Sequence, residues 1–148
     1  MAKIVNITEA VSIALHSMVL VAKAQKSQMN ATIISNITGS SKFHVSKVLQ
    51  KLVKDGFLLS QRGPAGGFVL ESPPEEITLL QIFESIEGKI IISKCPLNKV
   101  CPFGECIFED LTMIMTRQFR DYLEGHTLAD YMSSKKPHHP LAKSVISR

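Results

Sequence analysis

One stretch, residues 30–70, limits what this chain can fold into more than any other part of the sequence. Residues 31–38 are typical of a short helix that Asn30 can cap and that Gly39 interrupts. After a second helical segment, residues 57–61 and 68–70 have the composition of two short strands around the turn-forming sequence GPAGG. The order helix, turn, helix, hairpin predicts a winged helix-turn-helix, a mainly α fold with a small β-hairpin wing.

The second helix of this stretch should have one apolar face and one polar face. We expect it to begin at Ser40 or Ser41 and to stop before Gly56, since glycine readily adopts the left-handed conformation that ends helices. Its apolar residues recur at spacings of three and four, and they are Val45, Val48, Leu49, Leu52 and Val53. Its polar face carries Lys42, His44, Ser46, Lys47, Gln50, Lys51 and Lys54. A helix in this place in a helix-turn-helix enters the major groove of DNA.

The distribution of charge favours DNA binding over a lysine face that is merely solvated. Residues 40–62 contain five cationic side chains and one acid, the tail from Ser133 contains four cations and no acid, and the remainder contains eight cations and twelve anions. We expect the four lysines of the second helix to contact phosphates, and Ser41, His44 and Ser46 to contact base edges. The flanking minor groove should be reached by Arg62, Gly63, Pro64, Gly66 and Gly67.

The length and composition of the chain exclude several classes of protein. No stretch of the 148 residues is long and apolar enough to be a membrane span, and the N-terminus leads into a patterned helix rather than a signal peptide. We therefore expect a cytoplasmic protein with no membrane partner. No phosphate-binding loop, nucleophile elbow or telling pair of catalytic carboxylates is present, so we do not expect an enzyme.

Further helices are predicted on both sides of the central stretch. One should cover residues 7–24 and another residues 79–87, with Thr8 and Thr78 as their caps. A long helix from about Cys106 to Glu124 has more apolar surface than a small core can cover, which favours dimerisation over packing on its own chain. The predicted units are a DNA-binding domain (1–88), a cysteine loop (89–106), a dimerisation helix with a closing turn (107–132) and a flexible basic tail (133–148).

Three cysteines, Cys95, Cys101 and Cys106, are spaced C-x5-C-x4-C in a segment that contains two prolines and a glycine. Thiolates from such loops hold iron–sulfur clusters or zinc. The spacing matches neither zinc knuckles nor ferredoxins, and three thiolates are one ligand short of four. The residues alone leave open a cluster, a structural zinc ion or free thiols that respond to oxidation.

Several motifs together resemble the bacterial IscR/NsrR/CymR regulators, also called the Rrf-two family. The wing signature is present as Gly56-Phe57-Leu58 followed by Arg62-Gly63-Pro64-Ala65-Gly66-Gly67-Phe68-Val69-Leu70. The helix ITLLQIFESIEG, the three-cysteine loop and the closing TLADYM extend the resemblance over residues 7–132. It implies a homodimeric transcription factor, usually a repressor, whose partner is a double-stranded DNA operator.

The resemblance also implies a cofactor. In cluster-bearing members the cysteine loop holds an iron–sulfur cluster, so Cys95, Cys101 and Cys106 would be the thiolate ligands of a 2Fe-2S or a 4Fe-4S cluster. The fourth ligand differs among members: Glu109 stands where one type has a histidine, and Ser12 stands where the nitric-oxide-sensing type has an acid, with Glu9 and His16 one turn away. The implied regulator senses nitric oxide, redox state or the supply of iron and clusters.

Two other interpretations explain the same residues. One is the same fold without a cluster, controlled by oxidation of cysteine thiols or by a partner protein. The other is a structural zinc-binding protein that makes protein contacts.

Overall fold

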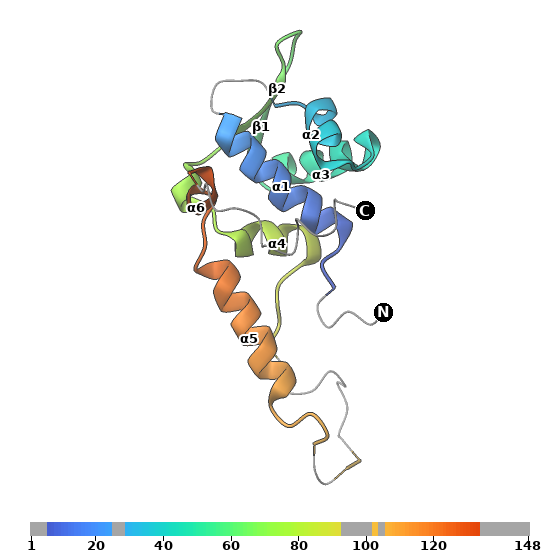
Figure 1. The fold of residues 1–148 in the computed structure, drawn as a ribbon, viewed down its shortest axis with the longest axis vertical. Helices are drawn as coiled ribbons and strands as arrows, with labels where there is room; N and C mark the ends of the chain where they lie inside the picture. Colours follow the sequence, from blue (N-terminus) through green and yellow to red (C-terminus); the bar gives the residue numbers. More distant parts are fainter. Residues whose placement is uncertain (1–5, 25–28, 93–101, 104–105, 134–148) are drawn as a thin grey trace, which may run out of the picture.

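The computed structural model describes residues 6–24, 29–92, 102–103 and 106–133. Their elements follow the order α1 (Glu9–Ala24), α2 (Ala31–Thr38), α3 (Lys42–Lys54), β1 (Leu58–Gln61), β2 (Gly67–Leu70), a 3₁₀ turn η1 (Pro74–Glu76), α4 (Leu79–Glu87), α5 (Leu111–Glu124) and α6 (Ala129–Met132). Figure 1 shows α1 to α4 and α6 gathered into one body beside the hairpin, while α5 projects away from it. A mainly helical fold with one small hairpin confirms the predicted fold class.

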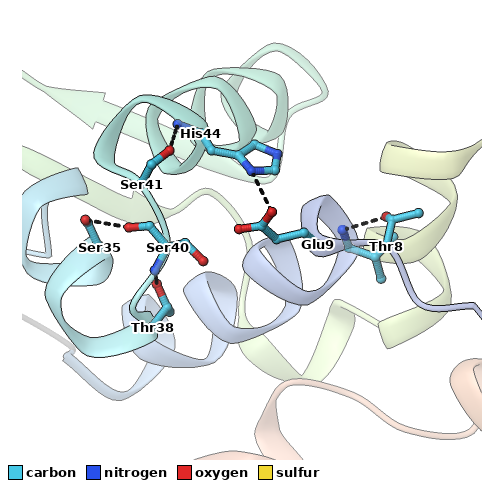
Figure 2. A network of polar contacts seen from close by, with 8 residues as sticks. Thr8, Glu9, Ser35, Thr38, Ser40, Ser41 and His44 are labelled. Atoms are coloured by element: carbon cyan, nitrogen blue, oxygen red, sulfur yellow. Dashed lines mark hydrogen bonds and ion pairs between the residues drawn. The ribbon is translucent and has the colours of Figure 1, made fainter. Parts of the chain in front are cut away.

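Side-chain caps set the limits of α2 and α3 where the sequence predicted them. Asn30 Oδ1 accepts a hydrogen bond from the backbone N–H of Ile33 at 3.0 Å, and Gly39 ends α2 with a φ of 72°. Ser41 Oγ accepts from the backbone N–H of His44 at 3.2 Å, so α3 starts after the later of the two predicted caps. The turn between the helices is held because Ser35 Oγ donates to the Ser40 carbonyl at 2.7 Å (Figure 2).

The end of α3 leads directly into the hairpin. Gly56, with a φ of 81°, allows the chain to reverse, and the backbone N–H of Phe57 donates to the Leu52 carbonyl at 2.9 Å. This is the pair of bonds expected of a glycine-ended helix, together with the bond from Gly56 N to Val53 O. Leu58, the first residue of β1, is fully buried, which fixes the start of the hairpin against the core.

The hairpin is antiparallel, with Leu58 opposite Leu70 and Gln61 opposite Gly67. Its base makes one pairing that the sequence did not predict: the N–H of Phe68 donates to the carbonyl of Met29 at 2.9 Å. A Cβ atom at Gly67 would lie only 2.8 Å from that carbonyl oxygen, so glycine is needed for the close approach.

Helix α1 lies at the centre of the body and packs against α3 and α4. The largest fully buried apolar side chains come from α1, α2, α3, β1, α4 and the residue before α6, and they are Val11, Ile13, Met18, Ile34, Val45, Leu49, Leu52, Leu58, Ile82 and Leu128. Helix α4 begins with a reciprocal cap in which Thr78 Oγ1 accepts from Gln81 N at 3.2 Å and Gln81 Oε1 accepts from Thr78 N at 2.8 Å. These contacts place the outer face of α3 on a rigid support.

Helix α5 begins five residues later than the sequence predicted. The apolar spacing placed its start near Cys106, but residues 107–110 form turns, Glu109 has a positive φ of 48°, and the helix starts at Leu111. Ile107 and Phe108 match the helical period, yet they are 80% and 52% exposed. Without burial of that face, the extra turn gains too little to form.

The segment after α5 returns to the body. The N–H of Leu79 donates to the His126 carbonyl at 2.9 Å, and the N–H of Leu128 donates to the Ile77 carbonyl at 3.0 Å. Leu123 and Leu128 are buried in the core that α1 and α4 share. The last turn of α5 and α6 therefore complete the body from which the rest of α5 projects. Among the residues described, no helix combines the length and apolarity needed to cross a bilayer.

Candidate nucleic-acid interface and cysteine segment

The outer face of α3 is a row of four side chains at spacings of four, three and four residues. Residues so spaced are neighbours on one side of a helix. Phe43, Lys47, Gln50 and Lys54 form this row, and all four are exposed. The opposite face buries Val45, Val48, Leu49 and Leu52 against α1, α2, α4 and the hairpin. The predicted polar face of the helix is thus presented outward, with lysines in two of the four positions.

Phe43 is a member of this row that the sequence analysis missed. Its side chain is 75% exposed, and Lys47 Nζ lies 5.7 Å from the centre of its ring, within the range of a cation–π contact. The predicted DNA contacts came from polar, basic and glycine-rich positions, so an aromatic residue was not among them. A signal was available: Phe43 lies outside the apolar series of α3 and four residues before Lys47.

Lys51 differs from the other predicted phosphate-binding lysines. Its Nζ lies 2.6 Å from Asp55 Oδ2, and the same oxygen accepts a hydrogen bond from Ser85 Oγ of α4, also at 2.6 Å. The bond from Lys51 and then the bond from Ser85 lower the pKa of Asp55 below its ordinary value of 3.8. A phosphate would have to compete with this carboxylate for Lys51. Lys42, Lys47 and Lys54 are exposed cations of the same helix.

His44 connects the interface to α1. Its Nδ1 lies 3.5 Å from Oε2 of Glu9, at the start of α1 (Figure 2). His44 and Ser46 are half-buried at the edges of the outer face, and the Ser41 hydroxyl oxygen already caps the helix. The predicted base-reading residues therefore lie beside the row headed by Phe43, rather than at its centre.

The hairpin tip presents Arg62, Gly63 and Pro64 to solvent. The two glycines that follow have structural positions: Gly66 N donates to Gly63 O at 2.8 Å, and Gly67 is buried against Met29. A Cβ at Gly66 would lie 2.5 Å from the Gln61 carbonyl oxygen. Of the predicted wing residues, Arg62 is the one that brings a charge to the tip.

The cysteine site is described only in part. Cys95 and Cys101, and the tail from residue 134, lie outside the described residues. Cys106 is exposed in the turn before α5, where its thiol donates a weak bond of 3.7 Å to the Glu109 carbonyl. No three His, Cys, Asp or Glu side chains among the described residues are grouped so that they could hold a metal ion. An exposed thiol with two further thiols nearby in sequence suits the donor chemistry of a cluster.

The candidates for a fourth ligand fall into two places. Glu109 lies beside Cys106 in the turn before α5. Glu9, Ser12 and His16 lie on α1, where His16 Nδ1 donates to the Ser12 carbonyl at 2.7 Å. Figure 1 shows that the N-terminal end of α5 is the end that projects farthest from the body, away from α1. A single chain therefore does not bring the α1 candidates to Cys106.

Helix α5 leaves a row of large apolar side chains uncovered. Leu111 and Tyr122 are each 54% exposed, Ile114 is 48% exposed, and Met115 is 37% exposed. The adjoining face of the helix is held to the body by Leu123 and by Phe119, whose ring packs edge-on against Phe83 of α4 at a centroid distance of 5.5 Å. The apolar excess that the sequence predicted is therefore present on the surface of the single chain.

Comparisons with known proteins find transcriptional regulators of similar sequence and solved structures of similar fold. IscR of Aliivibrio salmonicida, an HTH-type transcriptional regulator, is 27% identical to this chain over 127 residues, which are 85% of this chain and 71% of IscR. The structure of CymR of B. subtilis, described as the global cysteine regulator, matches with a TM-score of 0.74 and 24% identity, over 88% of this chain and 98% of CymR. The structure of T. potens IscR matches with a TM-score of 0.67 and 19% identity, over 85% of each chain.

The match to a protein family covers nearly the whole of the described region. A sequence model of the Rrf2 family, whose members are described as iron-dependent transcriptional regulators, matches residues 7–134. This range includes both the helix-turn-helix with its wing and the projecting helix α5. Taken with the winged-helix fold and the relatives that are regulators rather than enzymes, it places the chain in the Rrf2 family of transcriptional regulators.

Proposed function

We propose that this protein is a homodimeric repressor of the cytoplasm whose affinity for operator DNA is controlled by an iron–sulfur cluster. The outer face of α3 carries the proposal. It presents the exposed lysines Lys47 and Lys54, with exposed Lys42 at the start of the helix, and it lies beside a hairpin tipped by Arg62. Such a face suits the phosphates of a major groove, and an arginine at the tip suits the minor groove.

The exposed row on α5 supports the dimer. Apolar side chains at spacings of three and four residues along a projecting helix can pack against the same row of a second copy. A two-fold dimer would place two copies of α3 on two half-sites of one duplex. A second copy would also supply an α1 near Cys106, which the single chain does not do. The proposed dimer would thus provide both the two α3 helices for the two half-sites and the α1 residues that Cys106 lacks within one chain.

The cluster would be held by the thiolates of Cys95, Cys101 and Cys106, with the fourth position open among Glu109 of the same chain and residues of α1. When bound, it supplies a group that nitric oxide, oxygen or iron shortage alters. The chain's own residues connect this segment to DNA: α5 contacts α4 through Phe119 and Phe83, and Ser85 of α4 bonds Asp55 at the end of α3. A coupling of about 1–3 kcal/mol would shift DNA binding by about 5- to 150-fold.

DNA recognition is tested by selecting duplexes from a randomised library and measuring their dissociation constants against those of random duplexes. The proposal expects specific binding to be tighter by about 1,000-fold or more at physiological salt. Equal affinity for selected and random duplexes at low salt would overturn the proposed function.

The sensor is tested by purifying the protein without oxygen and measuring its visible spectrum, iron and inorganic sulfide. The proposal expects colour, iron and sulfide in the native protein, and their loss in Cys101→Ser with the dimer and the circular dichroism spectrum retained. Iron and sulfide retained at native levels in Cys101→Ser would remove this thiol from the ligand set.

A second interpretation, control by thiol oxidation without a cluster, has two observations in its favour. The Cys106 thiol is exposed, and CymR, one of the matching structures, is described as a cysteine regulator. This reading expects colourless protein after anaerobic purification and a change of DNA affinity on thiol modification. A structural zinc site would instead give zinc without sulfide.

A further inference from the structure

We propose that Phe43 determines sequence specificity by contacting the 5-methyl group of a thymine in the major groove. The proposal rests on the proposed function, because it assumes that α3 enters that groove. Phe43 is the most exposed aromatic side chain among the described residues, at 75%. Lys47 Nζ lies over the ring.

The position of Phe43 in α3 is that of a base-contacting residue. It is the second residue of the helix, directly after Lys42 and the cap Ser41. In helix-turn-helix proteins the residues near the N-terminus of the second helix reach the base edges, while residues farther along approach the backbone. Phe43 also begins the outward row that continues with Lys47, Gln50 and Lys54, so it points where that row points.

The chemistry of a phenyl ring selects its contact. The ring has no hydrogen-bond donor or acceptor for a base edge, and the thymine methyl is the apolar group that a base pair displays in the major groove. A cytosine or a purine at that position would leave the ring against polar atoms. The side chain therefore distinguishes thymine from the other bases by packing alone.

The charges around Phe43 favour DNA over a protein as its partner. Lys42 precedes the ring, and Lys47 Nζ lies 5.7 Å from its centre. An apolar protein surface that covered the ring would strip water from both ammonium groups without neutralising them. On DNA the same lysines would face phosphates while the ring faces a base. The contact of Lys47 with the ring holds the two groups ready for that arrangement.

The experiment removes the methyl group from the DNA and the ring from the protein. Within a selected duplex, each thymine is replaced in turn by deoxyuridine, which lacks only the 5-methyl group. For the native protein we expect one such replacement in each half-site to weaken binding by about fourfold, the value for one buried methyl group. Phe43→Ala should bind the thymine and uracil duplexes equally, while Phe43→Leu should keep part of the preference.

Lys54→Ala is the matched control, because it removes a lysine of the same row that lies about three helical turns from the ring. It should weaken binding to both duplexes alike and leave the ratio of their dissociation constants unchanged. The proposal is overturned if Phe43→Ala keeps the native sensitivity to uracil, or if no uracil replacement weakens the native protein. It is also overturned if Phe43→Ala changes the sedimentation of the DNA-free protein, which would assign the ring to a protein contact.

The outcomes separate this proposal from the function on which it rests. If the native protein shows no preference for selected duplexes, the proposed function itself is wrong. If the native protein is selective but insensitive to the thymine methyl group, only the assignment of Phe43 is wrong. Because Phe43 is exposed, its variants should retain the native circular dichroism spectrum and melting temperature, which are measured alongside.

Discussion

Lys51 and Asp55 form an ion pair of 2.6 Å at the end of α3, the helix that we propose contacts DNA. Asp55 is the single acid among residues 40–62, and its carboxylate is also bonded to Ser85 of α4. One of the four lysines of α3 is thus part of the joint between two helices. The lysines of this face are consequently not equivalent, although the sequence alone treats them alike.

The ion pair predicts different salt dependence for two lysine variants. Lys47→Ala should flatten the slope of log K against log salt concentration by about one unit, since one phosphate contact is lost. Lys51→Ala should change the slope much less, because Asp55 already holds that ammonium group. Fluorescence anisotropy titrations of one duplex over a series of salt concentrations measure both slopes. Equal flattening by the two substitutions would contradict the prediction.

The lowered pKa of Asp55 predicts how acid affects stability. The native carboxylate stays ionised at a pH where the unfolded carboxyl, with its ordinary pKa of 3.8, is already protonated. Its contribution to the free energy of unfolding is therefore complete above the unfolded pKa of 3.8 and is lost as the pH falls through the lower native pKa. Asp55→Asn should cost about 0.5 kcal/mol near neutrality, as surface pairs do, and the difference should vanish in acid. Urea unfolding at several pH values measures it, with Ser85→Ala expected to show a smaller effect of the same sign.

The exposed row on α5 predicts the effect of one charge on assembly. Ile114→Asp should raise the dissociation constant of the dimer by about 100-fold, because a carboxylate would be buried against apolar side chains. Arg117→Asp, an aspartate at another exposed position of the same helix, should leave the dimer intact. Sedimentation equilibrium distinguishes the two variants. A native protein that sediments as a monomer at micromolar concentration would contradict the proposed dimer.

The joint between α5 and α6 predicts an alkaline transition. Burial, and then the hydrogen bond with Tyr122, raise the pKa of Tyr131 from 10.0 to about 12. The native state therefore holds this proton where the unfolded state has lost it, and stability should fall as the pH rises from 10.0 toward about 12. The fall is at most about 1.4 kcal/mol per pH unit.

The two tyrosines of the chain make this transition easy to follow. Phenolate absorbance reports only Tyr122 and Tyr131, so Tyr131→Phe should remove the late component of the titration and flatten the loss of stability. A late component that persists in Tyr131→Phe would contradict the assignment.

A buried hydroxyl predicts a stabilising substitution. Ser17 of α1 is 0% exposed, and its Oγ has no hydrogen-bond partner. Ser17→Ala should raise the free energy of unfolding by about 1 kcal/mol, since an unsatisfied buried group is removed and alanine also favours a helix. Ser12→Ala on the same helix, whose hydroxyl lies 3.4 Å from His16 Nδ1, should gain only the helical preference. Denaturant unfolding of both variants provides the comparison.

Local chemistry made the body of the protein predictable from its sequence. Asn30, Ser41 and Thr78 each cap the helix that follows, because a side-chain oxygen can accept from a backbone N–H two or three residues on. The apolar period of α3 likewise identified its buried face, and Gly56 identified its end. These signals are contained within a few neighbouring residues, so no tertiary information was needed to read them.

What the sequence did not predict depends on contacts between distant segments. The pairing of Met29 with Phe68, the contact of Glu9 with His44 and the bond from Ser85 to Asp55 join residues far apart in the chain. The start of α5 was wrong for the same reason, since the period of Ile107 says nothing about whether a neighbour covers it. The assignments of the cysteines and of the individual DNA contacts stay predictions.

The close approach of Gly67 to Met29 has a consequence for how an operator can be discriminated. It joins the base of the wing to the segment that enters α2, while the short turn at Gly56 joins the same hairpin to α3. Within one subunit, the span from helix to wing tip is therefore set by backbone packing and resists adjustment. In the proposed dimer, a signal that changes promoter occupancy would then act on the spacing of the two subunits along the duplex, rather than on the contacts that each subunit makes with its own half-site.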